Sequence, residues 1–191
     1  HDLKKVLAYS TMSQLAYIFT GLGCAMFLAN TLDWQTDSDA HYIVIVAFGA
    51  ALFHLFNHAM AKGMLFMASG SVIHEVHHAH HHLHHHDDHG GHDDHHDEFD
   101  AQSMENMGGL ASKMPLTATA MLVGSASIMG LPLIGGFWSK EGIVGHTWDA
   151  FFHGESLMLG PALLILLTAG MTGFYMSRMW FMTFAGSPKS E

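Results

Sequence analysis

Four long apolar segments constrain the fold of this chain more than any other feature of its sequence. They cover residues 6–32, 42–73, 114–144 and 157–184, and a helix needs only about 20 apolar residues to cross the hydrocarbon core of a membrane. Because lipid offers the backbone no water, a spanning segment must satisfy its own N–H and C=O groups, as a helix does. The sequence therefore predicts an all-α integral membrane protein with about four transmembrane helices in this chain.

The composition agrees with a membrane protein. Of the 191 residues 49% are hydrophobic and only 13% are charged. The formal charge of −10 does not indicate an acidic soluble surface, because residues 74–100 contain 13 of the 19 histidines and 8 of the 17 acidic residues. Seven Lys and Arg in total argue against nucleic-acid binding. The single cysteine, Cys24, excludes an internal disulfide framework and is expected to be a buried small residue.

The start of the chain, "HDLKKVLAYS", has no initiator Met and no signal-peptide pattern. We therefore expect the chain to be an excerpt from a longer protein. We divide it into residues 1–73, with the first two helices, a His/Asp-rich segment over 74–112, residues 113–184 with the remaining helices, and a tail over 185–191.

Charged residues between the segments separate by sign if each segment crosses the membrane once. One side then carries Lys4, Lys5, Lys113, Arg178 and Lys189, and the other carries Asp33, Asp37, Asp39, Asp149 and Glu155. By the positive-inside rule the basic side is cytoplasmic. The His/Asp-rich segment is then cytoplasmic as well, and a prokaryotic plasma membrane is the expected location.

The third apolar segment is interrupted by "GLPLIGGFW". Pro132 removes a backbone donor, and Gly130, Gly135 and Gly136 loosen the helix around it. A broken helix at membrane depth is tolerated only beside protein or a water-filled cavity. We therefore predict a discontinuous transmembrane helix broken near Pro132; the alternative is that Pro132 ends a helix and a loop follows.

Two histidines and a lysine in the second apolar segment are the first candidate functional residues. His54, His58 and Lys62 follow one another at intervals of four residues, so they lie on one face of a helix, with about 6 Å of rise between neighbours. A lysine in lipid is costly and should face the bundle interior or water. We predict a proton relay along this face; the alternatives are hydrogen-bonded core histidines and a lysine close to a helix end.

Lys140 and Glu141 are further candidates, beyond the predicted helix break. As neighbours in sequence they do not share a helix face, so each should pair with other segments. The functional hypothesis is that Lys140 stores a proton while Glu141 tunes it or forms the exit. The alternative is an interfacial salt bridge.

The His/Asp-rich segment is expected to be a solvated and mostly disordered loop. Imidazole and carboxylate groups also bind zinc, copper or nickel, but low complexity does not define one coordination geometry. The candidate ligands for weak metal sites are His77, His78, His80, His81, His82, His84, His85 and His86. The chain has no Cys cluster, dinucleotide-binding glycine pattern or phosphate loop, so we expect no cofactor and no redox centre in it.

Three long stretches, "HDLKKVLAYSTMSQLAYIF", "FHLFNHAMAKGMLFMASGSVIH" and "MGGLASKMPLTATAMLVGSASIMGLPLIGGFWSKEGIV", resemble the antiporter-like subunits, called subunit L or chain 5, of respiratory complex I (NADH–quinone oxidoreductase). The resemblance implies a proton-translocating subunit of the membrane arm, surrounded by lipid and by other membrane-arm subunits, with quinone reduced elsewhere in the complex. It also implies that this chain forms most of the second of two inverted five-helix repeats.

The resemblance assigns roles to the candidate residues. His54, His58 and Lys62 match the family's central relay, and Lys140 matches the lysine on the second broken helix. The family commonly has Asp-Glu after that lysine, whereas this chain has Glu141-Gly142, so the role of Glu141 is less firmly implied.

Other functions fit parts of the same sequence. The large subunit of multisubunit Na+/H+ antiporters and the equivalent subunit of F420-dependent dehydrogenases share these motifs. A metal transporter with a His-rich loop would need intramembrane pairs of His and Asp, and the spans contain few carboxylates. An inert membrane scaffold would not need buried lysines.

Overall fold

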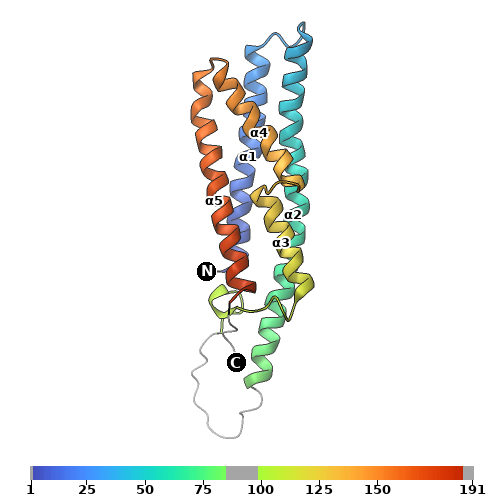
Figure 1. Cartoon of the computed structure of the whole chain (residues 1–191), viewed down its shortest axis with the longest axis vertical. Helices are drawn as coiled ribbons and strands as arrows, with labels where there is room; N and C mark the ends of the chain where they lie inside the picture. The colour runs from blue at the N-terminus through green and yellow to red at the C-terminus, as the bar shows by residue number, and fades with distance from the viewer. Residues whose placement is uncertain (1, 85–98, 187–191) are drawn as a thin grey trace.

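The computed structural model describes residues 2–84 and 99–186, and these ranges are helical with short connections (Figure 1). The α-helices are α1 (Leu3–Thr31), α2 (Ser38–His84), α3 (Pro115–Met129), α4 (Gly135–Phe152) and α5 (Leu159–Phe184), and the 3-10 helices are η1 (Met104–Asn106) and η2 (Ser156–Met158). The described ranges contain no strand, only an isolated bridge between Asp2 and Ser103. The predicted all-α membrane fold is confirmed.

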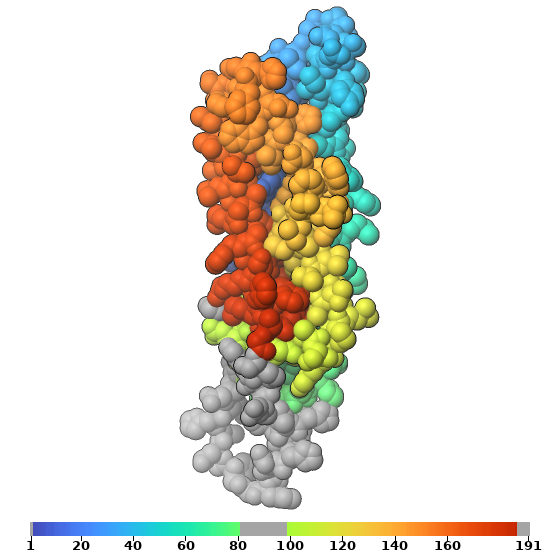
Figure 2. Space-filling model, in the orientation of Figure 1, coloured from blue at the N-terminus to red at the C-terminus, as the bar shows by residue number. Residues whose placement is uncertain are grey.

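The helices form an elongated bundle. Figure 1 shows α1, α2 and α5 along its length, with α3 leading into α4 beside them. Three stretches are long and apolar enough to cross a membrane, namely Leu3–Thr31, Ser38–His80 and Ser156–Phe184. The fourth predicted crossing corresponds to α3 and α4 together. On the face shown in Figure 2, α5 and the pair α3 and α4 cover much of α1, and a dark blue strip of α1 shows between them.

The predicted helix break lies between Met129 and Gly135. Gly130 ends α3 in the left-handed region with φ of 81°, a conformation that costs glycine little. The chain resumes as a helix rather than a loop, so the alternative reading of Pro132 is wrong. A Cβ atom on Gly136 would collide with the carbonyl oxygen of Ser127, which means that the start of α4 lies directly against the end of α3.

The His/Asp-rich segment differs from the expectation at both ends. Residues 74–84 continue α2, which is 47 residues long, because adding a residue to an existing helix costs far less than nucleating one. Residues 99–112 include η1, and Met104 and Met107 are buried there. This segment also pairs with the start of α1, since the Leu3 N–H donates to the Gln102 carbonyl at 3.0 Å.

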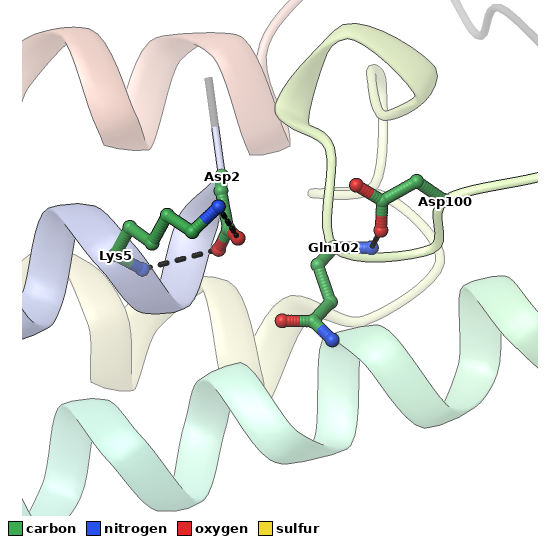
Figure 3. Close-up of polar contacts among 4 residues, drawn as sticks. All are labelled: Asp2, Lys5, Asp100 and Gln102. Atoms are coloured by element: carbon green, nitrogen blue, oxygen red, sulfur yellow. Dashed lines mark hydrogen bonds and ion pairs between the residues drawn. The ribbon is translucent and has the colours of Figure 1, made fainter.

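Local polar contacts lie on each side of this junction, at the start of α1 and in the segment around Asp100 (Figure 3). The Asp2 carboxylate accepts from the backbone N–H of Lys5 at 3.1 Å and so caps α1. The Asp100 carboxylate accepts from the backbone N–H of Gln102 at 2.9 Å. These local contacts shape each side of the junction, and the bond from the Leu3 N–H to the Gln102 carbonyl joins the two sides.

Apolar side chains pack in clusters along the bundle. One cluster gathers Leu7, Leu65, Met107, Met121 and Met176 near the N-terminal end of α1. Another, near the opposite end, includes Leu28, Val44, Ala150 and Cys24, which is buried as expected. Buried polar side chains lie between these clusters, on α1, α2, α4 and α5: Gln14, His54, His58, Lys62, Ser139, Lys140 and Thr172.

Replacing Gly136 by Ala should destabilise the bundle, because the added methyl group must push the start of α4 away from the Ser127 carbonyl. Overpacking of this kind costs about 1–3 kcal/mol, or a fall of about 2–10 °C in the unfolding temperature for a chain of this size. Thermal unfolding in detergent measures the change. Gly145→Ala is the control on the same helix, since a Cβ there meets nothing within 4 Å. Equal stability of the two variants would contradict the close contact.

Candidate functional site

The predicted face of α2 points into the bundle. His54, His58 and Lys62 keep only 3%, 7% and 6% of their surface exposed. The ring centroids of the two histidines are 6.4 Å apart with nearly parallel planes, and Lys62 follows His58 by one helical turn. The spacing of four residues thus produces a continuous buried row of titratable groups.

Lys140 reaches the same interior from α4. Its ammonium donates to the carbonyl oxygen of Ile128, near the end of α3, at 2.6 Å, and it lies 4.9 Å from the centre of the Tyr17 ring. The end of a helix carries unsatisfied carbonyls and a partial negative charge, and an aromatic face attracts a cation. The helix break therefore supplies a binding place for the ammonium group.

His54 connects four helices through hydrogen bonds. Its Nδ1 lies 2.9 Å from the Ser139 hydroxyl of α4, and its Nε2 lies 3.1 Å from Gln14 Oε1 of α1. The amide of Gln14 in turn donates to the Thr172 hydroxyl of α5 at 3.4 Å. Each contact is buried, so the imidazole has a partner at both nitrogens without water.

Lys62 lies well inside α2, so the alternative of a lysine at a helix end does not apply. Its ammonium donates to the Leu7 carbonyl of α1 at 2.6 Å. Within the described residues neither Lys62 nor Lys140 has a carboxylate within ion-pair distance. Backbone carbonyls therefore hold both ammonium groups, and the Tyr17 ring adds a contact to Lys140.

Within the described ranges, His58 is the residue of the row that lacks a hydrogen bond at one ring nitrogen. Its Nε2 is buried without a hydrogen-bond partner in the described structure. It lines a narrow space beside the helix break together with Gln14, Ser127 and Ile128, and this space is too small for a water molecule. Proton transfer through His58 therefore requires the space to widen or the side chains to move.

Asn57 holds the helix break from the other side of the same space. Its side-chain amide donates to the Gly135 carbonyl at 3.2 Å. Asn57 thus ties the first residue of α4 to the helix that carries the histidines.

The remaining predicted site residues lie elsewhere. Glu141 follows Lys140 but is exposed on the outer face of α4. His77, His78 and His80 lie on the extension of α2. His81, His82 and His84 belong to that helix, but their side chains lie outside the described structure, as do His85 and His86 entirely. No three metal-ligating side chains converge among the described residues.

Four residues around this site were not predicted from the sequence: Gln14, Tyr17, Ser139 and Thr172. Gln14 gave a usable signal, because an amide in the middle of an apolar span needs a buried partner. Ser139 and Thr172 gave none, since hydroxyls in membrane helices commonly bond to their own backbone. Their role follows only from the packing of α4 and α5 against α1 and α2.

An all-helical bundle with a discontinuous helix and with two lysines buried in its interior is the architecture of an integral membrane protein with a polar core. Residues 1–32 and 40–153 match the family described as NADH:quinone oxidoreductase/Mrp antiporter, transmembrane. The chain belongs to this family. The matched residues include both lysines, both histidines of the row and Glu141.

The names of proteins with similar sequences agree with this family assignment. The chain is 40% identical over 188 residues to NAD(P)H-quinone oxidoreductase chain 5 of Synechocystis sp., a match that covers 97% of this chain and 21% of the relative. It is 38% identical over 190 residues to the chloroplastic subunit 5 of Nephroselmis olivacea, covering 100% of this chain and 23% of the relative. The chain thus spans about a fifth of the length of the curated relatives it matches.

Replacing Gln14 by Leu should destabilise the polar layer, because it leaves a nitrogen of the His54 ring and the Thr172 hydroxyl without this partner. An unsatisfied buried polar group costs about 1–3 kcal/mol. Thermal unfolding in detergent measures the loss, with Asn30→Leu as the control, since Asn30 is exposed on the same helix and bonds only to the Met26 carbonyl. A Gln14→Leu variant as stable as the control would show that His54 does not depend on this contact.

Proposed function

We propose that this chain is part of a proton-translocating membrane-arm subunit of a respiratory NADH–quinone oxidoreductase, of the type called subunit L or chain 5. The family match and the names of the relatives support this assignment. Its partners are then the lipid bilayer and the other membrane-arm subunits, with quinone reduced elsewhere and no cofactor in this chain.

The buried row from Lys62 through His58 and His54 to Lys140 is the observation that carries the proposal. Its members come from α2 and α4 and meet at the helix break. A charged side chain at membrane depth costs several kcal/mol, so two lysines without carboxylate partners indicate a function that needs them. Proton exchange along the row is that function.

Ser139 allows His54 to change protonation state in place. Protonated His54 donates from both nitrogens, to Gln14 Oε1 and to the Ser139 oxygen, while the Ser139 hydroxyl donates to the Gly136 carbonyl at 3.1 Å. When Nδ1 loses its proton, the hydroxyl of Ser139 rotates and donates to it instead. Both states keep two hydrogen bonds to the ring, so the proton can come and go without an unsatisfied nitrogen.

Proton transfer along the row depends on the space beside His58. The ring centroids of His54 and His58 are 6.4 Å apart, farther than in two imidazole rings joined by a hydrogen bond, so a proton does not pass directly between them. The space beside His58 does not admit water. We propose that movement at the helix break, tied to α2 by Asn57, widens this space and completes the path during turnover. The described arrangement is then a closed state of the relay.

The charge asymmetry of the chain gives its proposed orientation, and the direction of transfer is proposed from that orientation. The basic side is proposed to be the cytoplasmic side of a prokaryotic plasma membrane, and the acidic side, with Asp33 and Asp149, receives the protons. Glu141 is proposed to act on the exit side of Lys140. Because it faces outward, it would do so together with protein that covers this face of α4.

A subunit of a multisubunit Na+/H+ antiporter is the second candidate, because the family description names both kinds of protein. The names of the relatives favour the oxidoreductase. A metal transporter is disfavoured, since the described spans bring no three metal ligands together.

Replacing Lys62 or Lys140 by Ala should lower proton pumping at least about 100-fold, the lower end of what a positioned acid–base group contributes. Proton uptake by vesicles holding the complete complex measures it, with quinone reduction followed in parallel to show that the complex assembles. Lys113→Ala is the matched control, because Lys113 is an exposed lysine outside the row.

The outcome separates the candidates. Loss of pumping in both row variants, with assembly and the control intact, supports the relay. Normal pumping in both row variants would overturn it. Sodium-dependent uptake without any link to quinone would support the antiporter instead.

A further inference from the structure

The extension of α2 carries a histidine arrangement that the proton path does not use. Residues 74–80 continue α2 as regular helix beyond the buried row, and His74, Glu75 and His78 are exposed there. They lie at the end of the bundle where residues 99–114 pack. This region is independent of the row around His54.

The sequence over residues 74–78, HEVHH, has the pattern H-E-x-x-H. On a helix this spacing places two histidines on one face, where they can bind the same zinc ion. The rings of His74 and His78 are stacked, with centroids 6.1 Å apart and planes 18° from parallel. Two imidazoles that share a zinc ion at about 2.0–2.1 Å from each nitrogen have centroids about 5 Å apart. A small rotation of the two side chains therefore produces the chelating geometry.

Glu75 completes the arrangement. Its carboxylate oxygen lies 3.6 Å from Nδ1 of His74. A carboxylate on the Nδ1 side of a zinc-binding histidine orients the ring and leaves Nε2 to face the metal. The contact to His74 is longer than a hydrogen bond, so a small movement of either side chain would let Glu75 orient that ring.

The helix that carries the pair is held in place. The ring of His80 stacks on Phe99 with centroids 3.9 Å apart. Glu75 and His80 line a cavity of about 200 Å³ together with Lys113 from the segment that enters α3. This packing on one face of the extension fixes its helical register, which a loose histidine tract would not have.

We propose that His74 and His78 form a two-histidine Zn2+ site on the extension of α2, oriented by Glu75. No third side chain of ligand type converges on the pair among the described residues, so water fills the remaining positions of the tetrahedron. A site with two protein ligands is open and reversible. It binds zinc at the surface of the bundle rather than moving it through the spans.

The test must separate this pair from the rest of the histidine tract. In the full-length protein, purified in detergent, every histidine between residues 81 and 96 is replaced by Asn, and Zn2+ is titrated by calorimetry at neutral pH. One zinc ion should bind per chain. His78→Ala in this background removes a ligand and should weaken binding by more than about 100-fold, whereas Glu75→Gln removes a partner of a ligand and should weaken it by about 10–100-fold or less.

His77→Ala is the matched control, because it removes a neighbouring exposed histidine and leaves the pair at 74 and 78 intact. We expect its affinity to stay within about twofold of the background, and binding in the background to fall at acidic pH as the imidazoles are protonated. Equal losses in the two alanine variants, or no binding in the background, would overturn the site. Helix content from circular dichroism confirms that each variant is folded.

Discussion

The structure depends on the need to satisfy every backbone polar group at a helix break inside a membrane. The end of α3 leaves carbonyl groups without helical partners, and the ammonium group of Lys140 occupies one of them at Ile128. On the other side of the break, the Asn57 amide donates to the Gly135 carbonyl and ties the start of α4 to α2. The groups that repair the break are therefore also the groups that build the site, so the break and the buried lysine require each other.

The polar layer is stable because apolar packing encloses it. Clusters around Leu65 and around Leu28 lie on either side of it along the bundle, which excludes water and strengthens the hydrogen bonds within. The same exclusion makes buried ammonium groups costly. That cost indicates that the lysines have a function. Between them lies His54, whose ring has hydrogen-bond partners at both nitrogens.

One continuous helix joins two chemically different regions. The middle of α2 carries the buried row, and its extension carries the exposed pair His74 and His78. The two regions use the same spacing of four residues, because that spacing aligns side chains on a helix. Burial distinguishes them: the bundle encloses the imidazoles of the row, where we propose proton transfer, whereas the rings of His74 and His78 are exposed.

The sequence by itself determined the helical class, the broken segment near Pro132 and the row on α2, because apolar length and periodicity are local properties of the chain. Only the tertiary structure decided that Gln14 and Ser139 meet His54, that Glu141 faces outward and that residues 74–84 remain helical. Which residues meet across helices depends on how each helix is rotated about its axis, and packing over the whole bundle sets that rotation. A low-complexity composition likewise predicts disorder, but a helix already formed in the membrane extends into such a segment at little cost.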